Sequence, residues 1–179
     1  MREDGAVTPG HDGQDDPRQE TSLEARVLER CRSTGVRLVL VEACTGGLLC
    51  GRLTEVPGAS AVVERGFVPY SYESKVEQLG VPLELLQAHG SVSAEAAEAL
   101  ARGALERSSA NWAIAETGIA GPGGGTPQKP VGLAFIAVMR RGGAVTVERH
   151  VFAGVRAQVR DAVARRAFEL LLEQLSVES

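Results

Sequence analysis

Strand-like and helix-like segments alternate along most of the chain, and this alternation constrains the fold more than any other feature. Residues 36–42 (VRLVLVE) are apolar enough for a buried strand. A segment with apolar residues at helical spacing precedes them, between a capping box at Thr21 and Glu24 and a stop at Gly35. Another helix-like segment, residues 48–55, follows them. This order favours an α/β chain.

The remaining segments follow the same alternation. A turn at 140–143 makes the last two strands antiparallel, and Pro69, which lacks an N–H, places the second strand at an edge or a strand end. The further predicted strands are 65–71, 111–117, 131–139 and 144–152, and the further helices are 73–79, 82–89, one capped by Ser93 that reaches Leu105, and one around 159–171. We therefore predict an α/β fold, a three-layer α/β/α sandwich with a mixed, roughly five-stranded sheet.

Length and charge divide the chain into a tail and one domain. The 179 residues suit a single domain, and residues 1–20 carry six acidic and two basic side chains with little apolar surface. We expect residues 1–20 to be a disordered acidic tail and residues 21–179 to fold.

The rest of the chain has as many basic as acidic residues, which does not favour a nucleic-acid partner. No apolar run reaches the roughly 18 residues of a membrane span, and the three cysteines have no metal spacing, so we expect a cytoplasmic protein without a membrane partner.

Two glycine-rich loops follow predicted strands. One contains Thr45, Gly46 and Gly47 and opens a helix, and the other runs over residues 118–130 with five glycines and three prolines. Ligands of open α/β sheets bind where the strands end, because free backbone N–H groups converge there. Neither loop has a phosphate-binding motif in its proper context, and the first also fits a simple tight turn. The length of the second favours a ligand site, with a nucleotide phosphate or ribose as the general candidate.

Lysine is rare in this chain, and both lysines lie beside the edge where the strands are predicted to end. Of 19 basic residues 17 are arginine, and the two lysines are Lys75 and Lys129. Burial lowers the pKa of a lysine and turns it into a neutral base, which an arginine cannot become. Two hypotheses stay open for each lysine: a role in the site, or a solvated charge on a helix or loop.

Four runs of the sequence resemble one known family. They are VEACTGGLLCGRLTEVPGAS, RGFVPYSYESKVEQLGV, HGSVSAEAAEALARGA and TGIAGPGGGTPQKPVG, and together they span about residues 21–175. In order and spacing they are similar to the C-terminal domain of CinA, the competence/damage-inducible protein, whose stand-alone form is a nicotinamide-nucleotide amidohydrolase. The resemblance implies a mixed five-stranded sheet, hydrolysis of nicotinamide mononucleotide to nicotinic acid mononucleotide and ammonia in NAD metabolism, no metal or other cofactor, and a homo-oligomer.

The resemblance also implies roles for particular residues. The family carries E-S-x-T-G-G in the first loop, with the serine as nucleophile, and Y-S-N-E-x-K after the second strand, with the lysine as its base. By this correspondence Lys75 is the base, Tyr70 the tyrosine of the same segment and Ala43 the position of the serine. The remaining candidates hold the substrate or the oxyanion (Thr45, Gly46, Gly47), form the opposing wall (Thr117, Gly118, Gly121) or contact the substrate from the long loop (Lys129).

This chain departs from the family pattern at the nucleophile. Ala43 has only a methyl group, which cannot attack an amide carbon. Three more positions depart: Tyr72 replaces the usual Asn, Glu116 replaces a small or apolar residue, and Val155 interrupts the common G-D-R. Because the scaffold motifs remain, these changes indicate a repurposed or inactivated site.

Two functional hypotheses follow. In the first, the chain is still an amidohydrolase that uses Cys44, Thr45 or a water activated by Lys75; if the loop continues the strand, Thr45 shares the face of position 43 and Cys44 does not. In the second, it binds a pyridine nucleotide without rapid turnover, as a sensor or interaction partner. A third hypothesis, that the alanine was introduced to trap substrate, does not account for the other three departures.

Overall fold

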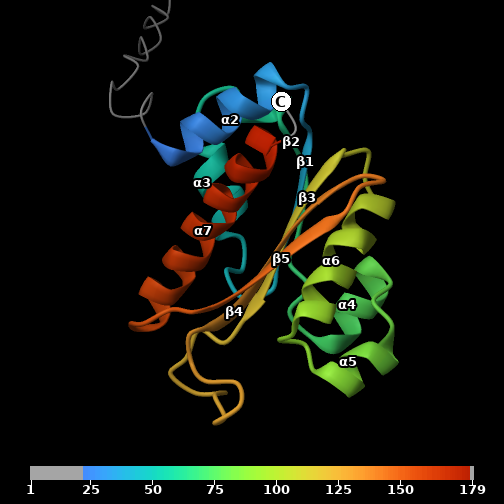
Figure 1. Ribbon diagram of the computed structural model, residues 1–179, viewed down its shortest axis with the longest axis vertical. Coiled ribbons are helices and arrows are strands. Elements are labelled where there is room, and N and C mark those ends of the chain that lie inside the picture. The colour runs from blue at the N-terminus through green and yellow to red at the C-terminus, as the bar shows by residue number, and fades with distance from the viewer. Residues whose placement is uncertain (1–21, 178–179) are drawn as a thin grey trace, which may run out of the picture.

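The computed structural model describes residues 22–177 and has a five-stranded sheet between two layers of helices (Figure 1). The strands are β1 (Leu38–Glu42), β2 (Val63–Phe67), β3 (Trp112–Gly118), β4 (Leu133–Arg140) and β5 (Val145–Val151), in the spatial order β2-β1-β3-β4-β5. β1 pairs in parallel with β2 and β3, whereas β4 pairs antiparallel with β3 and β5. The predicted mixed sheet is confirmed. The predicted tail, residues 1–20, lies outside the described residues.

Helices cover both faces of the sheet (Figure 1). The helices on one face are α2 (Leu23–Ser33), α3 (Leu48–Thr54) and α7 (Arg156–Val177); those on the other are α4 (Tyr72–Leu79), α5 (Leu83–His89) and α6 (Ala94–Glu106). A short 3₁₀ turn, η1 (Ala59–Ala61), precedes β2. The α/β/α sandwich predicted from the alternation is therefore confirmed. None of the helices within 22–177 combines the length and apolarity needed to span a membrane.

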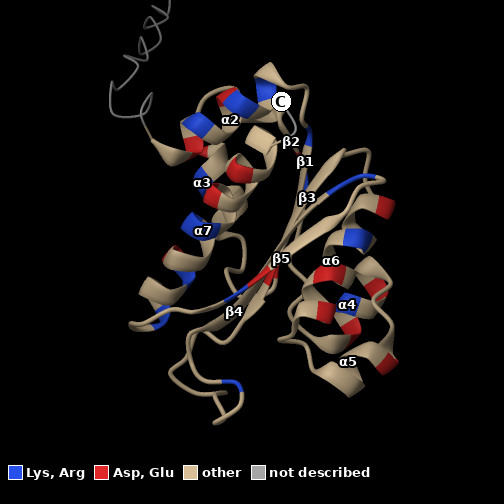
Figure 2. Ribbon diagram, viewed as in Figure 1, with Lys and Arg blue, Asp and Glu red and all other residues tan. Residues whose placement is uncertain are grey.

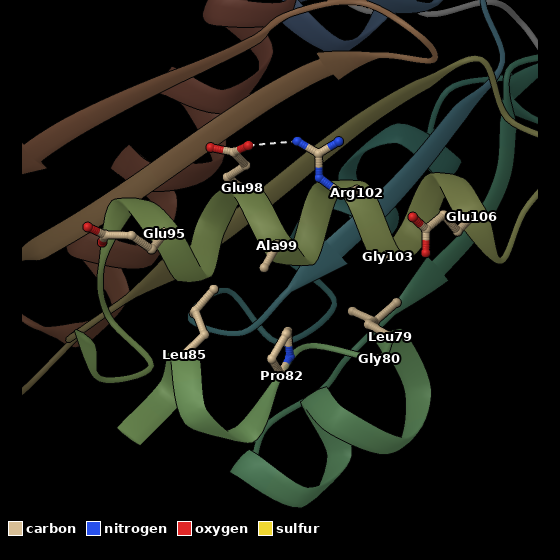
Figure 3. A pocket seen from close by; sticks show the side chains of 10 residues that line it. All are labelled: Leu79, Gly80, Pro82, Leu85, Glu95, Glu98, Ala99, Arg102, Gly103 and Glu106. Atoms are coloured by element: carbon tan, nitrogen blue, oxygen red, sulfur yellow. Dashed lines mark hydrogen bonds and ion pairs between the residues drawn. The ribbon is translucent and has the colours of Figure 1, made fainter. Parts of the chain in front are cut away.

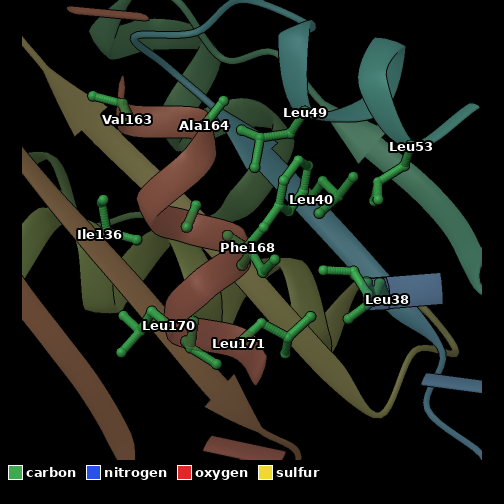
Figure 4. Close-up of a cluster of buried hydrophobic side chains, with 14 of the residues drawn as sticks. Leu38, Leu40, Leu49, Leu53, Ile136, Val163, Ala164, Phe168, Leu170 and Leu171 are labelled. Carbon is green, nitrogen blue, oxygen red and sulfur yellow. The ribbon is translucent and has the colours of Figure 1, made fainter. Parts of the chain in front are cut away.

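Alternating side chains of the central strands separate two hydrophobic clusters. Leu38 and Leu40 of β1 pack into the cluster under α7, while Val39 and Val41 pack into the cluster under α6. Phe168 of α7 lies at the centre of the first cluster (Figure 4). Successive residues of a strand face opposite sides, so the same alternation fixes the side on which each strand-end residue lies.

Two predicted element boundaries are wrong for local reasons. Ser22, not Thr21, caps α2, and its side chain accepts a hydrogen bond of 3.1 Å from Ala25 N. The second strand was expected over 65–71, but β2 begins earlier and ends at Phe67, before Pro69, whose missing N–H cannot continue the ladder. The other elements lie within a few residues of their predicted positions.

An ion-pair network ties β5 to α7. Glu148 accepts hydrogen bonds from Arg166 and lies 2.7 Å from His150 Nε2. The bonds from Arg166 are the main reason why the pKa of Glu148 is lowered to about 2. Figure 2 shows that basic and acidic residues both occur along α7. In the sheet register Glu148 lies opposite Ile136 and Ile136 lies opposite Glu116, so the network is two strands away from Glu116.

Candidate functional site

The loops singled out in the sequence meet at one edge of the sheet. β1, β2 and β3 run in parallel, so the segments that follow them leave the sheet at the same end. Two further segments join them through hydrogen bonds, the α5–α6 connection at 89–93 and the first turns of α7. The segments that carry Lys75 and Thr117 therefore leave the sheet at the same end.

Ala43 and Lys75 lie on the same face of this edge. Ala43 N donates to Glu116 O over 3.2 Å, so the hydrogen-bond ladder between β1 and β3 continues to residue 43. Because side chains alternate along a strand, the methyl group of Ala43 lies on the side of Val41, under α4 and α6. Lys75, on α4, is only 2% exposed, and its Nζ donates to Pro69 O over 2.8 Å. Burial lowers the pKa of Lys75, while the charge of Glu116 acts in the opposite direction. Lys75 is not a solvated surface charge.

Threonine and tyrosine side chains hold the α5–α6 connection against this face. Thr117 is buried, and its Oγ1 donates to Ser91 O over 2.6 Å. Tyr72 OH accepts from Ser91 N over 3.1 Å, so the residue that replaces the family asparagine has a structural contact here. Tyr70 points outward, is 66% exposed and lies with its hydroxyl 3.4 Å from Arg156 Nη2.

The long loop is tied down at both ends. Lys129 Nζ donates to His89 O over 2.6 Å and to Val92 O over 2.7 Å, so this lysine binds backbone of the same wall. Gly121 O accepts from Arg156 Nη1 over 3.1 Å. Gly118 leaves no room for a side chain, because a Cβ there would lie 2.8 Å from a carbonyl oxygen of β4. Both ends of the loop are therefore fixed against neighbouring segments.

Glu42 organises the other face of the same edge. Its Oε2 accepts from Gly47 N over 2.8 Å and from Leu49 N over 2.9 Å, and its Oε1 accepts from Cys50 N over 2.8 Å. Glu42 is fully buried. One carboxyl group thus receives the backbone donors at the start of α3, which fixes Gly46 and Gly47 between β1 and that helix. Both glycines have positive φ, at 61° and 98°.

Glu116 binds the same loop from β3. Its carboxyl group accepts from Cys44 N over 3.0 Å and from Thr45 N over 2.9 Å. The hydroxyl of Thr45 lies 2.7 Å from an oxygen of Glu116 and 2.7 Å from an oxygen of Glu42. Both carboxyl groups are fully buried. The expectation that Thr45 shares the face of Ala43 is wrong, because its hydroxyl turns to the side of these two carboxyl groups.

Two arginines of α7 complete this side of the edge. Arg160 donates to Thr45 O through Nε over 3.1 Å and also through Nη2, while Arg156 binds the long loop. Within the part of the chain described, neither arginine has an acidic partner. Arginine in the first turns of a helix opposes the helix dipole. Both residues lie beside the glycine-rich loops, where each donates to a backbone carbonyl group.

Four of these residues are given no role by the family motifs or by the glycine-rich loops: Glu42, Glu116, Arg156 and Arg160. The sequence nevertheless contains one feature that points to the two glutamates and one that points to the two arginines. Each glutamate stands near the end of an otherwise apolar strand, where burial of a charge is costly without a specific partner. Basic residues four apart at the start of a helix are likewise unfavourable unless they bind something.

A separate cavity lies between α5 and α6 (Figure 3). Its volume is about 440 Å³, and Glu98 and Arg102 form an ion pair at its rim. The lining residues are Leu79, Gly80, Pro82, Leu85, Glu95, Glu98, Ala99, Arg102, Gly103 and Glu106. None of them is a candidate residue of the loop edge. No three His, Cys, Asp or Glu side chains in residues 22–177 are grouped to hold a metal ion.

Comparison with known proteins identifies the family. The profile of the CinA C-terminal domain matches residues 20–175. A CinA-like protein of Akkermansia muciniphila is 45% identical over 152 residues, which cover 85% of this chain and 37% of that protein. A putative competence-damage inducible protein of Caldicellulosiruptor saccharolyticus is 45% identical over 84% of this chain and 36% of its own length. The chain thus spans little more than a third of the curated relatives it matches.

Solved structures agree over the whole fold. The competence/damage inducible protein CihA of Agrobacterium tumefaciens is 41% identical, with a TM-score of 0.84, over 96% of this chain and 99% of that one. A CinA superfamily protein of Klebsiella pneumoniae is 34% identical, with a TM-score of 0.83, over 86% of this chain and 96% of that one. Together with the profile match, these similarities show that the chain belongs to the CinA C-terminal domain family.

Proposed function

We propose that the chain binds a nicotinamide nucleotide at the loop edge of the sheet and hydrolyses its carboxamide only slowly. The substrate class is what the family resemblance implies. One observation carries the second half of the proposal: a methyl group, Ala43, stands on the face of the buried Lys75, at the position where the resemblance implies a serine. The base is present and the nucleophile is absent.

Neither neighbouring side chain is suited to replace the serine. Cys44 is 5% exposed and belongs to the cluster under α7, and burial, together with the charge of Glu116, raises the pKa of its thiol to about 12. The thiolate, which is the reactive form, is therefore scarce at neutral pH. Thr45 is fully buried, and its hydroxyl is bound between two carboxyl groups. Water activated by Lys75 is the remaining route, and it supports slow turnover.

The first test uses the native protein and nicotinamide mononucleotide. We expect binding in a calorimetric titration, with ammonia released far more slowly than by a relative that carries the serine, because binding and covalent attack depend on different groups. Rapid ammonia release by the native protein would show that a substitute nucleophile exists. Loss of that activity in Cys44→Ala or in Thr45→Val would identify it.

The second test concerns the phosphate of the ligand. Arg156 has no acidic partner in the described part of the chain and lies beside Tyr70 and Gly121, so we expect it to bind the phosphate. Arg156→Gln should weaken binding of the mononucleotide by roughly 10- to 100-fold, the value of one charge-assisted hydrogen bond. Binding of nicotinamide riboside, which has no phosphate, should stay unchanged.

The matched control is Arg165→Gln, an exposed arginine on the same helix. It should alter the affinity for neither ligand. An equal loss for mononucleotide and riboside in Arg156→Gln would contradict the phosphate assignment and leave the nucleotide proposal standing, whereas failure of the native protein to bind either ligand would overturn the nucleotide proposal itself.

A further inference from the structure

The hydroxyl of Thr45 lies between two buried carboxyl groups. Its Oγ1 is 2.7 Å from Glu42 Oε2 and 2.7 Å from Glu116 Oε1, and all three residues are fully buried. A hydroxyl group has one hydrogen and can donate to only one of the two oxygens. If both carboxyl groups were ionised, the other contact would join two lone pairs away from solvent, which is strongly unfavourable. One carboxyl group must therefore hold a proton and donate it to Thr45.

The contacts of the two glutamates show which one holds the proton. Glu42 accepts three backbone N–H bonds besides its contact with Thr45, and these bonds stabilise a carboxylate. Glu116 accepts backbone bonds from Cys44 and Thr45 only. Burial, together with the charge of Glu42, raises the pKa of Glu116 to about 7 against the effect of those bonds. The proton belongs to Glu116.

We propose that Glu116 is a positioning residue whose proton holds the loop 43–47 in place. Protonated Glu116 donates to Thr45, Thr45 donates to ionised Glu42, and both carboxyl groups fix the backbone of the loop. When the pH rises above neutrality, the proton of Glu116 passes to solvent and two carboxylates face each other across one hydroxyl. The loop then loosens, and with it the placement of residue 43. This inference goes beyond the proposed function and requires no ligand.

Other charged groups act on the same cluster. Lys75 approaches from α4 and feels the charge of Glu116, while Arg156 and Arg160 of α7 act on Cys44. With its pKa raised to about 12, the Cys44 thiol does not titrate near neutral pH. The arginines stay charged throughout. Lys75 is the neighbour whose protonation must be followed together with that of Glu116.

The proton on Glu116 is measured directly by ¹³C NMR of glutamate δ-carbons during a pH titration. The Glu116 signal is the one absent from Glu116→Gln and shifted in Thr45→Val, which removes the bridging hydroxyl. We expect a midpoint near pH 7, and a midpoint below about pH 5 would overturn the proposal. Lysine labelled at Cε separates Lys75, because the chain has one other lysine and Lys129→Arg leaves a single signal.

Stability against pH gives a second measurement that a purely structural role would not affect. In the unfolded chain the pKa of Glu116 returns to the ordinary value of 4.5. Between that value and pH 7 the folded protein keeps a proton that the unfolded chain has released, so raising the pH destabilises the fold. Relative to Glu116→Gln, the unfolding equilibrium constant should rise by roughly 10²-fold across this window and level off above it.

A surface glutamate provides the matched control. Bonds from Arg166 lower the pKa of Glu173, an exposed residue of α7, below its ordinary value of 4.5, so its stabilising contribution is lost only as the pH falls below that value. Glu173→Gln should therefore leave the slope between pH 4.5 and 7 as it is in the native protein. An equal slope in native protein and Glu116→Gln would overturn the proposal.

Hydrogen exchange of the Cys44 and Thr45 amides tests the effect on the loop. Both amides donate to Glu116, so their protection, corrected for intrinsic exchange rates, should fall as the pH rises past 7 in the native protein. In Glu116→Gln it should not change with pH. Constant protection in the native protein would overturn the proposal, and since no nucleotide is used, this result would leave the proposed function unaffected.

Discussion

Replacement of Ala43 by serine should raise ammonia release from nicotinamide mononucleotide by at least about 10³-fold. The removal of one member of a cooperating nucleophile and base costs on the order of 10⁶ in rate in serine proteases, and the substitution restores such a member. Position 43 is half-buried and lies on the face of Lys75, whose burial lowers its pKa and favours the neutral amine. The new hydroxyl therefore has a base on its own side of the sheet.

Two variants separate the chemistry from changes in packing. Ala43→Gly alters the same position without an oxygen and should give no increase. Ala43→Ser combined with Lys75→Met should lose most of the gain, because the serine then lacks its base. Ammonia is measured with a coupled enzyme assay, and nicotinic acid mononucleotide by chromatography. Unchanged turnover in Ala43→Ser, with binding intact, would contradict this prediction. It would show that Tyr72, Glu116 or Val155 has changed the site so much that a serine hydroxyl at position 43 does not restore catalysis.

Removal of the Glu42 side chain should destabilise the fold by about 3–6 kcal/mol. Each buried donor that loses its acceptor costs about 1–3 kcal/mol, and Glu42→Ala removes the acceptors of Gly47 N, Leu49 N and Cys50 N. A typical domain has 5–15 kcal/mol in total. The variant is therefore expected to lose a large fraction of its stability, which urea unfolding measures.

The pH and the control variant are chosen so that the measured loss of stability reports on the three backbone N–H groups that lose their acceptor. At pH 5.5 Glu116 keeps its proton, so relief of repulsion between the two glutamates does not offset the loss. Glu98→Ala removes one partner of the exposed ion pair with Arg102 on α6 and should cost at most about 1 kcal/mol. A loss below about 1 kcal/mol in Glu42→Ala would contradict the view that this side chain organises the start of α3.

Much of the fold was accessible from local patterns in the sequence. The strand over 38–42 and the helix over 94–106 follow from continuous or periodic apolar residues bounded by caps and glycines, because the side chains of a strand or helix reach the core at fixed intervals. One helix boundary was predicted wrongly because two adjacent residues could both cap the helix. Ser22 and Thr21 are both good caps, and only the structure shows that Ser22 binds Ala25 N.

The candidate site was predicted in part. The rule that parallel strands end at one edge predicts that the first loop, Lys75 and the long loop lie near one another, and β1, β2 and β3 are parallel neighbours, as this rule requires. The contacts within the site were not predictable. Lys129 binds the carbonyl groups of His89 and Val92, about 40 residues away in the sequence, and no local pattern encodes such a partner.

The sequence by itself determined the alternation of elements, the family motifs and the absence of a hydroxyl at position 43, since these depend on residue identity and short-range order alone. Only the tertiary structure decided the protonation and the partners of the buried charges. Glu42 and Glu116 are 74 positions apart, and the parallel register of β1 and β3 places them opposite each other with Thr45 between them. A buried charge takes its properties from the groups around it, and the fold supplies those groups.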